Sequence, residues 1–315
     1  MNKKIKYLSI IIVAVIIIFI AGGAIKNNSA INKLFSNKSD SEESGQQEIS
    51  DNTKVDDNQQ QVVEEEQDKQ EAEPAEEAEN INDESQVQYI DIAAEQVQIP
   101  ILMYHSISAA DPENGLLVAP EEFEAEVAYL KENGFTTLSL GEAVEAMKTG
   151  HVPEKPVVIS FDDGYVDNYT DAFNILKKYE MKGTFFIITD NTDGGGYMSL
   201  DMLKEMRDAG MDLENHTAHH LDLSTLSYDD QLESIKSGQD FLKENAGVDS
   251  EFVCYPSGKY NDTTIEVLNA LGIKGAVTTE YGIATAADGN YELKRIRIAP
   301  MSIDTFASIF SSFTE

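Results

Sequence analysis

From about residue 97 onward, short apolar runs alternate with helical patterns along the chain. Pro120 begins one helical segment that Gly134 ends, Ser199 caps another, and Gly150 and Gly272 mark further helix ends. Strands that alternate with helices predict a parallel sheet, and so many repeats favour a (β/α) barrel of seven or eight parallel strands. The apolar runs that predict strands are residues 99–104, 136–138, 157–161, 184–188, 211–214, 252–255, 276–278 and 295–298.

The start of the chain has a different pattern. Residues 1–6 are basic, and residues 7–25 form an uncharged apolar run about as long as the roughly 20 residues that cross a bilayer. The basic start favours a cytoplasmic N-terminus, so the run predicts an uncleaved signal anchor of a single-pass membrane protein whose downstream domain is extracellular. Small residues at Gly22, Gly23 and Ala24 keep a cleaved signal peptide, and hence a secreted protein, open as the alternative.

Residues 26–96 are rich in Glu, Asp, Gln, Asn and Ser and contain almost no aromatic or β-branched clusters. Such a segment buries too little apolar surface to offset the entropy of ordering, so it predicts a disordered acidic linker before a folded domain at residues 97–315. The chain has 23 Lys+Arg against 57 Asp+Glu, a net charge of −34. This balance argues against nucleic-acid binding, which requires clustered basic residues.

Two adjacent carboxylates stand at the end of a predicted strand that reads as buried. Residues 157–161 run directly into Asp162 and Asp163, which are followed by Gly164. Buried carboxylates at a strand end are costly unless a cation or hydrogen bonds hold them. An ordinary Asp-Asp-Gly turn explains the same letters, so this motif alone does not decide between a site and a turn.

Three of the five histidines cluster directly after another predicted strand, at residues 216–220. His216 and His220 are spaced i and i+4, as zinc-binding histidine pairs are. Surface histidines are the plainer alternative. Two histidines and one aspartate would leave a fourth position open, which is typical of catalytic rather than structural metal sites. With Cys254 as the one cysteine, a multi-cysteine metal site is excluded.

With these motifs the sequence resembles the polysaccharide deacetylases of the NodB-homology type, carbohydrate esterase family 4. Residues 160–164 look like the first motif of the family, and the resemblance implies that Asp162 is the catalytic base and Asp163 a metal ligand. Residues 216–220 look like the second motif, which implies that His216 and His220 are the other ligands. Tyr255, Pro256 and Ser257 are similar to the third, where a backbone N–H after the proline, here that of Ser257, supplies an oxyanion contact.

The chain departs from the pattern of this family at three places. The third motif usually begins with Arg and ends in an aromatic residue, where this chain has Cys254 and Ser257, and the Trp of the fourth motif is missing because the chain has no Trp. No histidine follows His220 to serve as the usual general acid. Residues 100–106 place His105 at the end of the first strand. This stretch resembles the start of the exported poly-N-acetylglucosamine deacetylases. We therefore expect His105 to be the general acid, with a purely hydrogen-bonding residue as the alternative.

Arg295 and Arg297 lie on the last predicted strand, where alternation places both on one face. The sequence leaves open whether one of them holds Asp162 in place of the missing motif-three arginine or whether both form surface ion pairs. Cys254 is expected to be a buried strand residue without nucleophilic activity, and His151 a surface residue.

The resemblance implies a metal-dependent N-deacetylase that acts on a cell-envelope or biofilm polysaccharide containing N-acetylglucosamine. Zn²⁺ is the expected cofactor, with Co²⁺ or Ni²⁺ as other divalent ions that such ligands accept. The expected partners are the acetylated polysaccharide and the membrane, and no protein partner is implied. The net charge of −22 on residues 97–315 favours a neutral glycan over an anionic polymer. A hydrolase for another acyl or amide group, or a tethered glycan-binding module with weak catalysis, remains an alternative.

Overall fold

The computed structural model describes residues 87–314. The predicted membrane anchor and nearly all of the predicted linker therefore lie outside the described residues. Within residues 87–314, no helix is both long enough and apolar enough to cross a bilayer.

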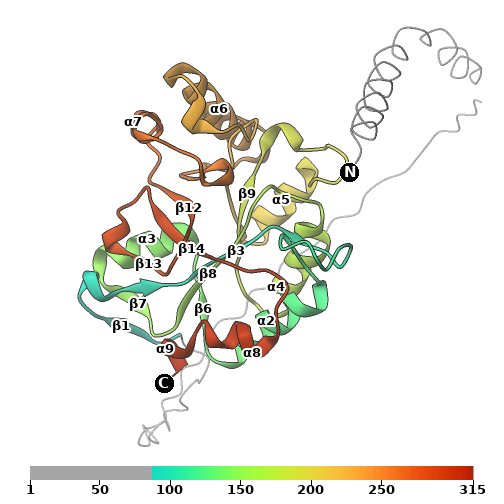
Figure 1. Cartoon of the computed structure of the whole chain (residues 1–315), viewed down its shortest axis with the longest axis vertical. Helices are drawn as coiled ribbons and strands as arrows, with labels where there is room; N and C mark the ends of the chain where they lie inside the picture. Colours follow the sequence, from blue (N-terminus) through green and yellow to red (C-terminus); the bar gives the residue numbers. More distant parts are fainter. Residues whose placement is uncertain (1–86, 315) are drawn as a thin grey trace, which may run out of the picture. The chain divides into compact units, whose positions relative to one another are not determined.

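Seven parallel strands close into a barrel, which confirms the predicted barrel architecture. The closing contact is made by β3 and β8, where Leu102 lies opposite Ile159. Figure 1 shows these strands at the centre with helices around them. In their order around the barrel the strands are β3 (Ile101–Tyr104), β14 (Leu293–Arg297), β12 (Gly275–Tyr281), β11 (Phe252–Cys254), β10 (Asp212–Asn215), β9 (Thr184–Ile187) and β8 (Pro156–Phe161).

An eighth parallel strand, β6 (Thr136–Thr137), joins the sheet without taking part in the closure. It pairs with the first residues of β8, at Pro156 and Val157. The last residues of β8, Ser160 and Phe161, pair instead with β9. One long strand thus borders both β6 and β9 on the same side, so the sheet has eight parallel strands, of which seven close the barrel.

The strands are buried on both faces, as parallel strands covered by helices should be. All six residues of β8 are buried, which accounts for the uninterrupted apolar run in the sequence. The one hydroxyl among them, on Ser160, donates a hydrogen bond of 2.6 Å to the Leu102 carbonyl oxygen and so avoids an unsatisfied polar group. On the same strand, the ring of Phe161 stacks on Phe185 of β9.

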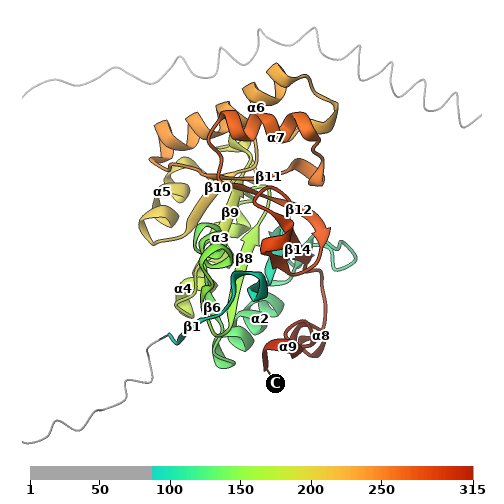
Figure 2. The ribbon, with the colours of Figure 1, turned by 90° about the vertical axis from the view of Figure 1, so that its left-hand side faces the viewer.

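The helices begin and end where the sequence signals predict. Ser199 accepts a hydrogen bond from the Met202 N–H at the start of one helix, and Gly150 ends another in the left-handed region, with φ 79°. A Cβ at Gly150 would lie 2.0 Å from the Ile92 carbonyl oxygen, so only glycine fits there. In Figure 2, α6 and α7 lie side by side at one end of the domain. The helices are α2 (Pro120–Glu132), α3 (Leu140–Thr149), α4 (Asn174–Lys178), α5 (Leu200–Asp208), α6 (Tyr228–Phe241), α7 (Asp262–Ala270), α8 (Ile303–Ser308) and α9 (Ser311–Thr314).

Short antiparallel pairs extend the domain beyond the predicted elements. Strand β1 (Tyr89–Asp91) pairs with β7 (His151–Pro153), and β2 (Gln98–Ile99) pairs with β13 (Ala284–Thr285). A short parallel pair, β4 (Ser106–Ile107) with β5 (Leu117–Val118), frames the loop after β3. Strand β1 falls in the range that the sequence assigns to the linker. Three residues are too few for a periodic signal, and their order depends on pairing with a segment 60 residues away.

A buried carboxyl on α2 makes the stability of the domain depend on pH. Glu126 is 2% exposed, and its Oε2 accepts a 2.8 Å hydrogen bond from the Tyr104 hydroxyl. Burial raises the pKa of Glu126 to about 8, so the folded protein holds a proton that the unfolded chain releases at a lower pH. The free energy of unfolding is therefore expected to fall as pH rises from about 4.5 to about 8, by a few kcal/mol at about 1.4 kcal/mol per pKa unit.

The substitution Glu126→Gln keeps the hydrogen bond to Tyr104 without the titratable proton, so it should flatten this dependence. The measurement is urea unfolding of both proteins between pH 5 and pH 8.5. Glu121→Gln, which changes an exposed carboxylate on the same helix, serves as the control and should keep the slope. Equal slopes in the native protein and the Glu126 variant would show that Glu126 is already ionised when folded.

Candidate active site

The polar residues singled out in the sequence meet at one end of the barrel, where the strands have their carboxyl ends. His105 follows β3, the two aspartates follow β8, and the histidine pair follows β10. They line a cavity of about 260 Å³. The complete lining is His105, Leu116, Asp162, Asp163, His216, His220, Ser257, Thr279 and Arg297. The sequence analysis did not single out Leu116 or Thr279, since neither residue type has a motif that marks such a position.

Asp162 is held by a fully buried arginine. The Arg295 guanidinium donates to both carboxylate oxygens, from Nη1 to Oδ1 at 2.7 Å and from Nη2 to Oδ2 at 2.8 Å. The remaining donors are also used, because Nε donates to the Thr278 carbonyl oxygen at 2.8 Å and Nη1 to the Ser160 hydroxyl at 3.2 Å. Burial by itself raises the pKa of Asp162, but Arg295 outweighs burial and holds that pKa well below its ordinary value. Asp162 is therefore an ionised carboxylate in a fixed orientation.

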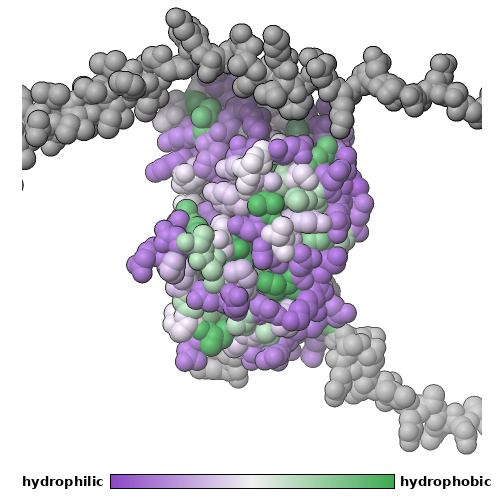
Figure 3. Space-filling view, turned by 90° about the vertical axis from the view of Figure 1, so that its right-hand side faces the viewer, coloured by the Kyte–Doolittle hydropathy of each residue, from purple (hydrophilic) through white to green (hydrophobic). Residues whose placement is uncertain are grey.

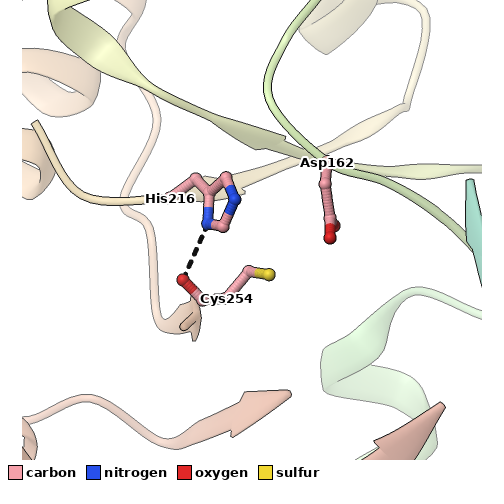
Figure 4. A group of neighbouring side chains, drawn as sticks. All are labelled: Asp162, His216 and Cys254. Carbon is pink, nitrogen blue, oxygen red and sulfur yellow. Dashed lines mark hydrogen bonds between the residues drawn. The ribbon is translucent and has the colours of Figure 1, made fainter. Parts of the chain in front are cut away.

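Asp163, His216 and His220 bring their donor atoms together. Oδ1 of Asp163 lies 3.4 Å from Nε2 of His216 and 3.5 Å from Nε2 of His220, and the three potential ligand atoms lie within 4.8 Å of one another. The Nδ1 of His216 is 2.8 Å from the Cys254 carbonyl oxygen, the bond drawn in Figure 4. That bond fixes the proton on Nδ1 and leaves the Nε2 lone pair directed toward Asp163.

The electrostatics of this cluster favour positive charge. Burial lowers the pKa of His216, but Cys254 and Asp163, which its two ring nitrogens contact, raise it further than burial lowers it. A proton and a divalent cation compete for such a position. Two imidazoles, one carboxylate and a bond that orients the buried imidazole therefore fit a divalent metal ion.

The backbone is strained at the residues that build the cluster. Among the described non-glycine residues, six have a positive φ, and four of these line the cavity or adjoin it. They are Asp163 (φ 75°), Thr217 (φ 65°), His220 (φ 53°) and Ser257 (φ 52°). Such conformations cost energy and persist where the surroundings enforce them, which is common at functional sites.

Asn215 supports the strained turn after β10. Its Oδ1 accepts a 2.8 Å hydrogen bond from the Thr217 N–H, and its Nδ2 donates to the Ile235 carbonyl oxygen at 2.8 Å. Gly238 of α6 makes room for this side chain, because a Cβ there would lie 2.2 Å from the Asn215 oxygen. The sequence analysis missed this role, since the partners of Asn215 on α6 are 20 residues or more away.

His105 faces Asp162 across the cavity. Its Nε2 lies 3.8 Å from Oδ2 of Asp162, and its side chain is 12% exposed. Its backbone carbonyl oxygen accepts a 2.7 Å hydrogen bond from Nδ2 of Asn168. Burial lowers the pKa of His105, although Asp162 and Asp163 act in the opposite direction. The imidazole is therefore mainly neutral at neutral pH and readily gives up a proton once it has gained one.

Of the three residues in the third motif, Ser257 is the one that lines the cavity. Tyr255 is fully buried, donates from its hydroxyl to the Tyr291 carbonyl oxygen at 2.9 Å and stacks on Tyr260. Pro256 is buried as well. The side chain of Tyr255 therefore belongs to the core. Of this motif, only Ser257 is positioned for the expected substrate contact, which is taken up below as a proposal.

The remaining predictions concern residues beside the site. Arg295, not Arg297, binds Asp162, which resolves the alternative that the sequence left open. Cys254 is buried on β11 as predicted, and its Sγ is 3.2 Å from Nη2 of Arg295; burial raises the pKa of its thiol. His151 lies at the surface as expected, 2.9 Å from an Asp91 carboxylate oxygen and stacked on Tyr89. His219 is turned away from the cluster toward Asp190.

The fold and the site define a (β/α)-barrel protein with a carboxylate and a histidine facing each other beside a candidate cation site. A family model described as polysaccharide deacetylase matches residues 149–276. YxkH of Bacillus subtilis, named as a polysaccharide deacetylase, is 38% identical over 217 residues, which cover 68% of this chain and 77% of that protein. The chain belongs to the polysaccharide deacetylase family, an enzyme family, and the resemblance seen in the sequence is thereby confirmed.

Two further relatives are informative. Poly-β-1,6-N-acetyl-D-glucosamine N-deacetylase of Staphylococcus epidermidis is 28% identical over 241 residues, which cover 68% of this chain and 83% of that protein. The structure of the deacetylase PplD of Streptococcus pyogenes, in complex with acetate, matches with a TM-score of 0.65 and 39% identity, and covers 67% of this chain and 97% of that one. The similarity spans the barrel and nearly the whole of the PplD chain.

Proposed function

We propose that this domain removes N-acetyl groups from an N-acetylglucosamine-containing polysaccharide of the cell envelope or of a biofilm. The observation that carries the proposal is the joint arrangement of Asp162, His105 and the Asp163, His216 and His220 cluster in one cavity. The family membership supports the reaction type. The similarity to a poly-β-1,6-N-acetyl-D-glucosamine deacetylase supports this class of glycan.

A divalent cation, Zn²⁺ or another ion such as Co²⁺ or Ni²⁺, is proposed to bind at Asp163, His216 and His220. When bound, it supplies a Lewis acid that polarises the amide carbonyl and lowers the pKa of a coordinated water. Three protein ligands leave a coordination position open for this purpose. The other residues of the cavity then have roles that follow from their own positions.

Hydrolysis adds the elements of water across the amide C–N bond. Asp162 is proposed to take a proton from the attacking water as general base, while Arg295 keeps its carboxylate ionised and correctly oriented. The Ser257 N–H donates a hydrogen bond to the oxygen that becomes negative as the carbonyl carbon turns tetrahedral. His105 gives a proton to the leaving amine, the C–N bond breaks, and acetate and a glucosamine unit result.

Because Arg295 depresses the pKa of Asp162, the proton that Asp162 accepts is not held firmly there. His105 is a proton acceptor close to it, since its Nε2 lies 3.8 Å from Oδ2 of Asp162. If the two side chains approach each other, or if one water bridges them, Asp162 can pass this proton to His105, which delivers it to the leaving amine. The base and the acid therefore act as one unit in the proposed mechanism.

The test is a substrate screen with the full-length protein, purified in detergent, stripped with chelator and reloaded with zinc or cobalt. Acetate release from N-acetylglucosamine oligomers and from peptidoglycan is expected to rise at least about tenfold on reloading. A parallel screen with O-acetylated and N-acylated small molecules tests the alternative, a hydrolase for another acyl or amide group. Faster release from these small molecules than from the glycans would favour that alternative. Metal-loaded protein that binds the oligomers in calorimetry but releases no acetate would instead identify a glycan-binding module.

A further inference from the structure

The mouth of the barrel has two chemically different halves. One half, following β3, β8 and β10, holds the histidines and aspartates to which the proposed mechanism assigns roles. The other half consists of the adjacent strands β11, β12 and β14. Ser257, Thr279 and Arg297, which follow or belong to these three strands, line the same cavity. Apart from the buried Arg295 side chain, which holds Asp162, the proposed mechanism uses only one backbone N–H of this half, that of Ser257.

Arg297 differs from the other two arginines of the chain. Arg295 is paired with Asp162, and Arg207 forms an ion pair with Asp208. Arg297 is exposed, and its guanidinium forms neither an ion pair nor a hydrogen bond within residues 87–314. It follows Arg295 by two residues, so both side chains leave the same face of β14, with Arg295 buried and Arg297 at the rim.

An unpaired guanidinium is unexpected in this chemical setting. Residues 97–315 contain 37 acids and 15 bases, so carboxylate partners are plentiful on the rest of the surface. Figure 3 shows hydrophilic residues over most of the face that it draws. The two carboxylates that share the cavity with Arg297 are engaged elsewhere, since Asp162 binds Arg295 and Asp163 faces the histidine pair. Arg297 is thus available to a ligand that enters the cavity.

The chemistry of this half of the mouth selects for an anion. A guanidinium offers a planar fork of N–H donors that matches a carboxylate or a phosphate with two parallel hydrogen bonds. The hydroxyls of Thr279 and Ser257 add two further donors, and neither bonds to another side chain in the described part of the chain. The two hydroxyls can also accept hydrogen bonds, so the group that favours an anion over a neutral sugar is the unpaired guanidinium, and none of these three side chains carries a negative charge.

We propose that Arg297, with Thr279 and Ser257, forms an anion subsite that binds a carboxylate or phosphate substituent of the glycan next to the N-acetyl group. This inference rests on the proposed deacetylase function and narrows its substrate class. The substrate is an N-acetylated glycan with an isolated anionic group near the amide that is cleaved. A densely charged polyanion is disfavoured, because the acidic domain repels it at long range.

The test compares two tetrasaccharides of equal length with the full-length protein. One consists of N-acetylglucosamine alone, and the other is a peptidoglycan strand in which alternate N-acetylhexosamines carry a carboxylate. The native protein is expected to have an at least tenfold higher kcat/KM on the carboxylated tetramer. Arg297→Gln should lose at least tenfold on that tetramer and stay within about threefold on the neutral one. Arg297→Lys, which keeps the charge without the fork, should fall between the two.

Arg207→Gln is the matched control, since Arg207 lies on α5 outside the cavity, and it should leave both rates unchanged. An equal loss on both tetramers in Arg297→Gln would overturn the anion subsite, as would a native preference for the neutral tetramer.

Failure of the proposed function would be recognised separately, as the absence of acetate release from either tetramer. Calorimetric binding of the carboxylated tetramer then decides the inference. A Kd at least tenfold weaker in Arg297→Gln than in the native protein supports the subsite. An unchanged Kd overturns it.

Discussion

Replacing Asp162 by asparagine is expected to lower kcat for acetate release by at least about 100-fold, the usual contribution of a general base. Asparagine has nearly the same shape but cannot accept the proton of the attacking water. It also ends the double ion pair with Arg295, whose bonds to the two carboxylate oxygens measure 2.7 and 2.8 Å. Acetate release is measured on N-acetylglucosamine oligomers with metal-loaded protein, and activity within a few-fold of native would contradict the assignment of the base.

This variant needs a control for folding, because it leaves the buried Arg295 charge without a partner. Breaking a buried ion pair in this way costs about 3–5 kcal/mol, so its thermal unfolding midpoint should also fall. The double variant Asp162→Asn, Arg295→Met removes the unpaired charge and is expected to recover much of the stability. If the double variant is stable and still inactive, the loss belongs to the missing base and not to unfolding.

Replacing His105 by glutamine is also expected to reduce kcat by about 100-fold or more, because the leaving amine then lacks its proton donor. His105 has to start neutral to receive the proton from Asp162 and pass it to the amine, and burial lowers the pKa of His105 from its ordinary value. In the native protein kcat/KM should therefore decline as pH falls through that lowered pKa. The variant should lose this dependence together with the rate, which a pH profile of acetate release measures.

The exposed His151 provides the matched control for this experiment. His151→Gln changes a histidine that is paired with Asp91 at the surface and should keep both the native rate and the native pH profile. A rate within about threefold of native in His105→Gln would show that another group protonates the amine. His105 would then keep only the alternative role, orientation of Asp162 from 3.8 Å away.

The half of the site that holds the aspartates and histidines could be predicted from the sequence because it is local. Asp162 and Asp163 directly follow a strand whose six residues are all buried, and His216 directly follows β10. Parallel strands bring their carboxyl ends together, so an apolar run followed by polar residues is enough to place both groups at one mouth. The histidine at the end of β3 was found by the same reasoning.

The contacts that tune the site could not be predicted, because their partners are far apart in the sequence. Arg295 is 133 residues from Asp162, and nothing near either residue distinguishes this pair from a surface ion pair. The Glu126 and Tyr104 pair gives no sequence signal either, since an amphipathic helix normally exposes its glutamates. Short strands such as β1 escape detection because three residues cannot show a period, and their order comes from tertiary pairing alone.

The position of β3 in the barrel has a consequence for how the protein acquires its activity. This strand, which carries His105, is paired on one side with β8 and on the other with β14, near the end of the chain. His105 and Asp162, the proposed acid and base, follow these neighbouring strands β3 and β8, but Arg295 joins them only when β14 lies between β3 and β12. A growing chain that has not yet reached β14 therefore lacks the arginine that holds Asp162, and in the proposed mechanism it has no complete reaction centre.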